Sequence, residues 1–329
     1  MRAAEAGANV DVPARSGPGS THGSERPTGT VSPRPSETTD REPTSMADQF
    51  PAQQQQPPGL TAPMQPNPDH GEQSYQGSGK LVGRRAFVTG GDSGIGRAVA
   101  IAFAREGADV AIGYLPAEQP DAEETRDWVQ RAGRTCVLVP ADLTDEQQAR
   151  DSVGTAVSGL RGLDVLVNNA GFQMARRSSI ADISSADLDR TMRTNLYAMF
   201  WVTQVALAHM AAGGSIINTT SIQAYQPSTS LLDYASTKAA IANFTVNLAS
   251  EVGSKGIRVN AVAPGPIWTP LQPATQPVEK LEKFGSDTPL GRAGMPAEVA
   301  PAYVFLAAES TGSYVSGTVL GVTGGKPVF

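Results

Sequence analysis

A tyrosine and a lysine four residues apart, Tyr234 and Lys238, form the pair in this sequence best suited to proton transfer. Apolar and small residues recur at helical spacing after them, which predicts a helix with both side chains on one face. An ammonium group beside a phenol favours the phenolate and pulls the tyrosine pKa down from about 10 toward neutral. Such a tyrosine donates and recovers a proton near neutral pH, as carbonyl reduction requires. The same spacing occurs by chance on solvated helix faces, so the pair must be interpreted together with the motifs upstream.

A glycine-rich turn lies upstream, between an apolar run at 86–88 and an alanine-rich helical pattern. Gly90, Gly94 and Gly96 would let the backbone turn tightly and approach a pyrophosphate at a helix N-terminus, where free N–H groups favour anions. A plain strand-to-helix turn is the simpler alternative.

Further motifs follow in a fixed order. They are the turn at 89–96, Asp142-Leu143, Asn168-Asn169-Ala170-Gly171, Asn195, Ser221 thirteen residues before Tyr234, and Pro264-Gly265 with Ile267 and Thr269. On these motifs the chain, from about Lys80 to the C-terminus, resembles the compact short-chain dehydrogenases/reductases. The segments around Gly90, Tyr114, Ser221 and Pro264, together with residues 64–81, resemble the bacterial general-stress type of aldehyde/alcohol oxidoreductase. Members of that group carry an N-terminal extension.

The resemblance implies an NAD(P)(H)-dependent oxidoreductase that transfers hydride between a nicotinamide cofactor and a small carbonyl or alcohol substrate, such as an aldehyde, ketone, polyol or sugar. Tyr234 would be the acid/base, Lys238 would lower its pKa and bind the nicotinamide ribose, and Ser221 would hold the substrate oxygen. Asn195 would complete a water-linked proton relay; an asparagine that satisfies a helix backbone group is the common alternative. The cofactor-binding residues that the resemblance implies are Gly90, Asp92, Ser93, Gly94, Ile95, Gly96, Tyr114, Asp142, Leu143, Asn169, Ala170, Gly171, Tyr234, Lys238, Pro264, Gly265, Ile267 and Thr269.

The choice between NAD and NADP depends on the end of the second predicted strand, residues 113–115, which contain no acidic residue. NAD enzymes usually place a carboxylate there to bind the ribose 2′-OH. Its absence removes repulsion against a 2′-phosphate, and Arg97 is the nearest basic candidate to meet one. The sequence permits both cofactors, with a slight lean to NADP(H).

Two alternative functions differ in class from this one. A catalytically silent dinucleotide-binding redox sensor or stress scaffold usually lacks the tyrosine or the lysine, and both are present here. A sugar-nucleotide epimerase or dehydratase has a different glycine spacing and a longer C-terminal substrate domain. For the substrate pocket the sequence predicts a lining of Gln223, Tyr225, Gln226, Phe284 and the loop at 268–292.

Composition divides the 329-residue chain into three parts. Residues 1–79 hold twelve of the 25 prolines, no isoleucine and no lysine. Such a stretch cannot bury enough apolar surface to offset the entropy of ordering. We therefore expect a disordered tail at 1–45, with Met46 as an alternative start. A Pro/Gln-rich, extended and partly ordered segment would follow at 46–79, and a Rossmann-type oxidoreductase domain at 80–329.

Net charge and residue usage exclude several other classes. The formal charge of −6, of which the first 79 residues carry −4, does not suggest a nucleic-acid partner. No run of 18 apolar residues predicts a membrane span, and the tail lacks the features of a targeting peptide, so we expect a cytoplasmic protein. The lone cysteine, Cys136, lies in an apolar run and is interpreted as core filler. No cluster has metal-ligand spacing, and we expect no metal.

The region from residue 80 onward alternates strand-like and helical patterns. Strands are predicted at 86–89, 109–113, 135–139, 165–168, 215–219, 258–262 and 318–322, with helices beginning near Ile95, Asp121, Asp145, Ala186, Leu232 and Pro296. This alternation predicts an α/β fold in which a seven-stranded parallel, doubly wound sheet carries helices on both faces.

The family resemblance further implies a homotetramer. The helix that carries Tyr234 would present a second apolar side, made of Ala239, Ala242, Val246 and Ala249, to a symmetry mate. The simpler alternative is that these alanines only favour helix formation.

Overall fold

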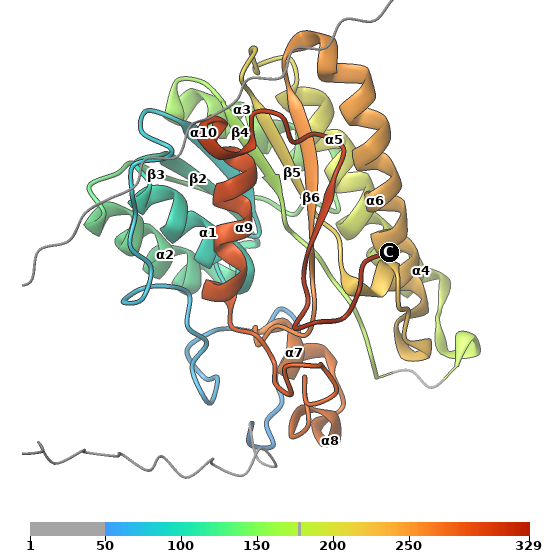
Figure 1. Ribbon diagram of the computed structural model, residues 1–329. Helices are drawn as coiled ribbons and strands as arrows, with labels where there is room; N and C mark the ends of the chain where they lie inside the picture. Colours follow the sequence, from blue (N-terminus) through green and yellow to red (C-terminus); the bar gives the residue numbers. More distant parts are fainter. Residues whose placement is uncertain (1–49, 177–178) are drawn as a thin grey trace, which may run out of the picture. The chain divides into compact units, whose positions relative to one another are not determined.

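The computed structural model describes residues 50–176 and 179–329 (Figure 1). The predicted tail at 1–45 lies outside the described residues. Seven parallel strands form one sheet in the order β3-β2-β1-β4-β5-β6-β7. They are β1 Arg85–Thr89, β2 Asp109–Tyr114, β3 Cys136–Pro140, β4 Val165–Asn168, β5 Ser215–Thr219, β6 Arg258–Pro264 and β7 Val319–Val322. The predicted parallel sheet is therefore confirmed.

Helices connect the strands and cover the sheet. They are α1 Gly94–Arg105, α2 Gln119–Arg131, α3 Glu146–Leu160, α4 Ser185–Met192, α5 Ala198–Ala206, α6 Leu232–Val252, α7 Leu271–Thr275, α8 Val278–Leu281, α9 Pro296–Ala307 and α10 Glu309–Gly312. Side chains of α1, α2 and α9 pack into one apolar core, and those of α3, α5 and α6 pack into a second. The two groups lie on opposite faces of the sheet (Figure 1). A parallel sheet needs cover on both faces, which explains why the central strands β1, β4, β5 and β6 are buried almost along their whole length.

The register of the strands places the carboxyl ends of β1, β2 and β4 level with one another. Arg85 of β1 lies opposite Asp109 of β2, and Ala86 lies opposite Val165 of β4. The carboxyl ends of the central strands therefore meet at one edge of the sheet, where ligands bind in open α/β folds. The helix expected near Ala186 runs through α4, a π-helical turn at Arg193–Tyr197 and α5. The short helices α7, α8 and α10 were not predicted.

Residues 50–79 contain no helix or strand and pack against the region that begins at residue 80. One end of this segment is held by Glu106, which is 1% exposed. Tyr75 donates its hydroxyl to Glu106 Oε1 at 2.6 Å, and the backbone N–H groups of Ser78 and Lys80 each donate to Oε2 at 2.9 Å. At the other end, the Phe50 ring stacks on Trp268 with 3.9 Å between centroids. Over residues 50–176 and 179–329 no helix is both long and apolar enough to cross a membrane.

Candidate functional site

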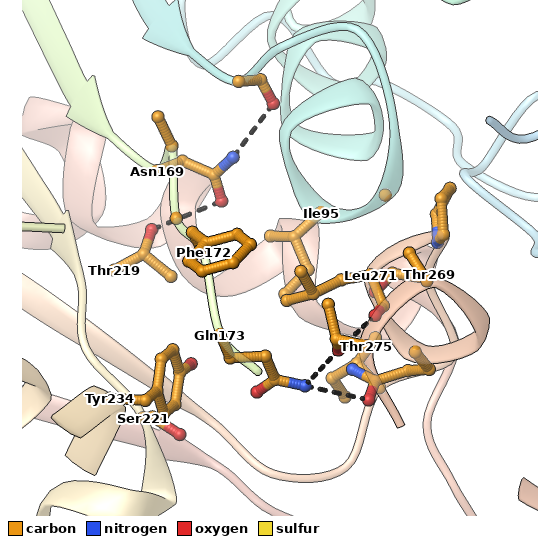
Figure 2. A pocket seen from close by; sticks show the side chains of 18 of the residues that line it. Ile95, Asn169, Phe172, Gln173, Thr219, Ser221, Tyr234, Thr269, Leu271 and Thr275 are labelled. Atoms are coloured by element: carbon orange, nitrogen blue, oxygen red, sulfur yellow. Dashed lines mark hydrogen bonds between the residues drawn. The ribbon is translucent and has the colours of Figure 1, made fainter. Parts of the chain in front are cut away.

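A cavity of about 650 Å³ opens where the carboxyl ends of the strands meet. It is lined by all of the predicted catalytic and cofactor-binding residues except Gly96 and Asn195. Ser221 and Tyr234 lie together in the close view of this cavity, and Asn169 lies nearer the glycine turn (Figure 2). The topology thus brings residues from six strand ends, far apart in sequence, to one space.

The glycine turn between β1 and α1 leaves no room for side chains at its tightest point. A Cβ on Gly96 would lie 1.8 Å from the carbonyl oxygen of Gly90, and Gly90 itself has a φ of 61°. Ser93 precedes α1 as its N-cap residue but makes no side-chain cap hydrogen bond. The first-turn N–H groups of α1 therefore lack a side-chain acceptor there, which suits an anionic ligand.

Asn169 fixes the glycine turn to the loop that follows β4. Its Nδ2 donates to the carbonyl oxygens of Thr89 at 3.1 Å and Gly90 at 3.0 Å. In return Thr89 Oγ1 accepts from the backbone N–H groups of Asn169 at 2.9 Å and Ala170 at 3.1 Å. The Asn169 amide nitrogen is thus committed within the protein, and its role is to set the distance between two walls of the cavity.

The adenosine side expected from the sequence contains Tyr114, Asp142 and Leu143, and all three line the cavity. Oδ1 of Asp142 accepts from the backbone N–H and the hydroxyl of Thr144, at 2.9 and 2.8 Å. These bonds hold the turn that leads from β3 into α3.

Two further carboxyl groups line the same side, Asp92 of the glycine turn and Glu118 after β2. Burial raises the pKa of Asp92 to about 6. Burial, together with the charge of Asp92, raises the pKa of Glu118 to about 8. The raised pKa of Glu118 lowers the negative charge that this side chain presents to a ligand. The sequence prediction missed Glu118 because it lies four residues beyond the strand end, in the short 3₁₀ turn Pro116–Glu118.

Arg97 was the expected basic partner of a 2′-phosphate, and the structure corrects this. Its side chain is fully buried and does not line the cavity. It donates to the carbonyl oxygens of Asp92 at 2.8 Å and Asp121 at 3.0 Å, and to the Glu124 carboxylate at 2.8 Å. Its role is to brace the glycine turn against α2, because a buried guanidinium needs partners for its N–H groups.

Ser221 and Tyr234 lie together in the cavity (Figure 2), and the Ser221 hydroxyl partly opposes the rise in the Tyr234 pKa that burial causes. Ser221 follows β5, where its Oγ also accepts from the backbone N–H of Gln223 at 3.1 Å. Lys238, one turn after Tyr234 on α6, is 3% exposed. Its Nζ donates to the carbonyl oxygen of Thr219 at 2.8 Å and lies 5.4 Å from the centre of the Tyr234 ring.

The pKa values of this pair differ from the expectation. Burial raises the pKa of Tyr234 to about 12, and the neighbouring Ser221 hydroxyl only partly opposes the rise. Burial also lowers the pKa of Lys238 to about 7. The prediction of a lowered tyrosine pKa was wrong for the polypeptide alone, since both groups lose water and each therefore favours its neutral form. A phenol at neutral pH remains able to donate its proton.

Asn195 lies in the π-helical turn between α4 and α5, behind Phe172 rather than on the cavity wall. Its Oδ1 accepts from the backbone N–H of Phe172 at 2.7 Å, and its Nδ2 donates to the Phe172 carbonyl oxygen at 2.9 Å and to Thr237 Oγ1 at 3.0 Å. π-Helical turns are frequent at functional sites. Here the turn brings the Asn195 amide onto the backbone of the loop after β4.

The predicted substrate pocket is only partly correct. Gln223 and Phe284 line the cavity, whereas Tyr225 and Gln226 do not. Trp268 is fully buried against Phe50 and cannot contact a substrate. The lining residues that sequence reasoning missed include Phe172, Gln173, Arg190, Lys326 and residues 57–59. Only Phe172 and Gln173 had a local signal, since they directly follow the motif that ends at Gly171.

Two other kinds of chemistry, attack by a thiol and metal catalysis, would each need their own groups. Burial raises the pKa of the Cys136 thiol to about 12, so it is not a nucleophile at neutral pH. Among the residues that the structure describes, no group of three or more His, Cys, Asp or Glu side chains could hold a metal ion.

Comparisons with known proteins agree with this geometry. A sequence-family model described as "Enoyl-(Acyl carrier protein) reductase" matches residues 90–326. The uncharacterized oxidoreductase YhxD of Bacillus subtilis is 56% identical over 284 residues, which cover 85% of this chain and 94% of that protein. General stress protein 39 of B. subtilis is 49% identical, with coverage of 84% and 96%. The chain belongs to the short-chain dehydrogenase/reductase family.

Two further members of the short-chain dehydrogenase/reductase family add a cofactor to the comparison. The NADPH-dependent aldehyde reductase 1, chloroplastic, of Arabidopsis thaliana is 47% identical, over 82% of this chain and 96% of that protein. A short-chain dehydrogenase from Burkholderia cenocepacia, solved in complex with NADP, superimposes with a TM-score of 0.69 at 35% identity, over 75% of this chain and 99% of that chain. The predicted family is thus confirmed, and the general-stress resemblance with it.

The chain is therefore an oxidoreductase of the short-chain dehydrogenase/reductase family that uses a nicotinamide cofactor. Its residues fit such a cofactor for two reasons. The glycine turn beside the cavity has no room for side chains, so its backbone stays accessible, and the N-terminus of α1 has no side-chain cap. None of the comparisons supports the alternative of a catalytically silent sensor.

Proposed function

We propose that the protein reduces small aldehydes or ketones with NADPH, and oxidises the corresponding alcohols in the reverse direction. The observation that carries the proposal is that Ser221, Tyr234 and Lys238 line the same cavity as the glycine turn. NADPH would supply the hydride that the carbonyl carbon receives.

In this proposal the protein's own groups orient the substrate and move its proton. Ser221 holds the carbonyl oxygen within reach of Tyr234, whose phenol gives its proton to that oxygen as the alcohol forms. Lys238, held by Thr219, places a positive charge close to the tyrosine ring when it is protonated. That charge stabilises the phenolate that proton transfer leaves behind.

We assign Asn195 a positioning role that does not exclude the expected proton relay. Its amide fixes both polar backbone groups of Phe172, which lines the cavity. A Cβ placed on Gly171 would lie 3.6 Å from Lys238 Nζ and 3.7 Å from Asn195 Oδ1, so the lysine and the asparagine flank the same glycine.

NADP(H) is the preferred cofactor in this proposal. Its support is the NADP(H) of the two relatives above, together with the raised pKa of Glu118, which lessens the negative charge of that side chain. A protonated carboxyl group does not repel a phosphate, whereas a carboxylate does. NAD(H) stays a second candidate, because no basic side chain replaces Arg97 on this side of the described cavity.

A screen of the purified protein tests the proposed function. Small aldehydes, ketones, polyols and sugars are offered with NADPH or NADH (or the oxidised forms), and turnover is followed by the absorbance of the reduced nicotinamide. We expect turnover of at least one aldehyde or ketone, with a higher kcat/KM for NADPH than for NADH. Tight binding of dinucleotide without turnover of any compound would favour the silent sensor.

We also propose that the protein is a homotetramer and cytoplasmic. Val246 on α6 is 49% exposed and Phe200 on α5 is 40% exposed. The rings of Phe200 and Phe244 meet edge to face, with 4.5 Å between their centroids. These apolar groups lie on α5 and α6, where another copy could cover them. The sequence predicted such a contact for the helix that is now α6.

Static light scattering at micromolar concentration should give four times the monomer mass. Val246→Asp should lower the mass, because it buries a charge in the contact. Val82→Asp is the matched control, since Val82 is 73% exposed and lies before β1. A parent protein that is monomeric and fully active would contradict the proposal.

A further inference from the structure

Residues 57–59 line the cofactor cavity although they lie outside the part of the chain that the family model matches. Two of them are prolines and the third is Gly59, which is buried. Proline has no N–H to donate, so this stretch offers a ligand mainly an apolar surface that excludes water. We call residues 57–61 the proline strap.

The strap is fastened on one side to α2. The backbone N–H and the hydroxyl of Thr61 both donate to Asp121 Oδ2, at 2.9 and 3.0 Å. Thr61 is 6% exposed and Asp121 is 3% exposed, so neither bond competes freely with water. Hydrogen bonds to a buried charged group are stronger than bonds between neutral groups.

On the other side the strap packs against α7. A Cβ on Gly59 would lie 2.4 Å from the carbonyl oxygen of Pro270, and the N–H of Gln55 donates to the carbonyl oxygen of Pro273 at 3.0 Å. The preceding residues run beside α7 in Figure 1. Further along, Trp268 Nε1 donates to the carbonyl oxygen of Pro66 at 2.8 Å.

These two anchors lie on different elements that border the cavity. Helix α2 follows β2, on the side of Tyr114 and Glu118, whereas α7 follows β6, on the side of Thr269. A chain held at both sides and lining the space between them restricts the way out of the cavity. Moving it aside requires breaking the Thr61 hydrogen bonds or separating Gly59 from Pro270.

We propose that the proline strap forms part of the dinucleotide site and slows release of the cofactor. The inference rests on the proposed function, since it takes NADPH as the ligand. It assigns to the N-terminal extension a contribution to cofactor binding, made by apolar contact and exclusion of water.

The test is the dissociation rate of NADPH from the full-length protein, measured by stopped-flow fluorescence after mixing with excess NADP⁺. Gly59→Ala forces the strap away from Pro270, and Gly154→Ala is the matched control because its Cβ would meet nothing within 4 Å. Thr61→Val removes one bond to Asp121 at nearly constant volume. We expect dissociation to accelerate about tenfold in Gly59→Ala and about threefold in Thr61→Val, the size of effect that follows loss of one or two good contacts.

The outcomes separate the inference from the function on which it rests. Parent protein that binds neither NADPH nor NADH contradicts the proposed function itself. Parent protein that binds NADPH, with folded Gly59→Ala and Thr61→Val variants releasing it at the parent rate, overturns the strap alone. A lower Tm without faster release would show that the strap only stabilises the fold, and would equally overturn the inference. If Gly59→Ala does not fold, the Thr61→Val rate decides.

Discussion

Tyr234→Phe is expected to lower kcat for carbonyl reduction by about 10² to 10⁴, the usual contribution of a general acid or base. The substitution keeps the ring beside Lys238 and removes only the hydroxyl that meets Ser221. Binding of NADPH, measured by fluorescence titration, should change little, because the ring still fills its place in the cavity wall. The loss should therefore appear in kcat rather than in the cofactor Kd.

Tyr225→Phe is the matched control for this result. It makes the same chemical change, loss of a phenol hydroxyl, at a tyrosine that lies nine residues earlier and does not line the cavity. Its kcat should match the parent. A Tyr234→Phe variant that keeps its turnover within a few-fold of the parent would remove Tyr234 from the proposed mechanism.

The second large effect concerns Lys238 and the pH dependence of the reaction. Its pKa is lowered to about 7, so Lys238 is charged at lower pH and loses its charge as the pH rises through 7. Tyr234, with a pKa raised to about 12, keeps its proton across this range. The rate of reduction should thus be flat in mild acid and fall up to tenfold per pH unit above about 7, if only the charged lysine supports proton transfer. Alcohol oxidation needs the tyrosine without its proton beside the charged lysine, so its rate should rise up to about pH 7 and level off above it.

Variants at position 238 check the assignment. Lys238→Met should lower reduction about 10²-fold or more at every pH. Lys238→Arg keeps its charge at high pH, so any activity that it retains should lack the fall near pH 7. Lys255→Met, an exposed lysine just after α6, should leave the profile unchanged. An alkaline fall near pH 7 that persists in an active Lys238→Arg variant would show that another group titrates.

The strands and the motif residues could be predicted because their signals are local. β4 and β5 have the predicted bounds, since each is a short apolar run followed at once by polar residues. Glycines at 90 and 96 indicate a close backbone approach whatever surrounds them. The order of motifs along the chain was enough to place them at the same edge of a parallel sheet.

The rest depended on partners that are distant in sequence. Nothing near Trp268 indicates that Phe50 covers it, and nothing near Arg97 indicates that α2 supplies Asp121 and Glu124 as partners. The direction of the Tyr234 pKa shift also depended on burial. Spacing alone shows that a lysine is near, but it does not show how much water both groups lose.

The buried carboxylate of Glu106 sets a limit on how far the chain can be shortened. Four donors from residues before β1 reach it: the hydroxyl of Tyr75, the hydroxyl of Ser78, and the backbone N–H groups of Ser78 and Lys80. A protein trimmed to the boundary at residue 80 would keep the carboxylate and lose three of these donors. Of these partners, Lys80 alone would remain beside it, and a buried charge that loses most of its partners is destabilising. We therefore expect a version that starts at residue 80 to be less stable than one that starts before Tyr75, which thermal unfolding of the two would show.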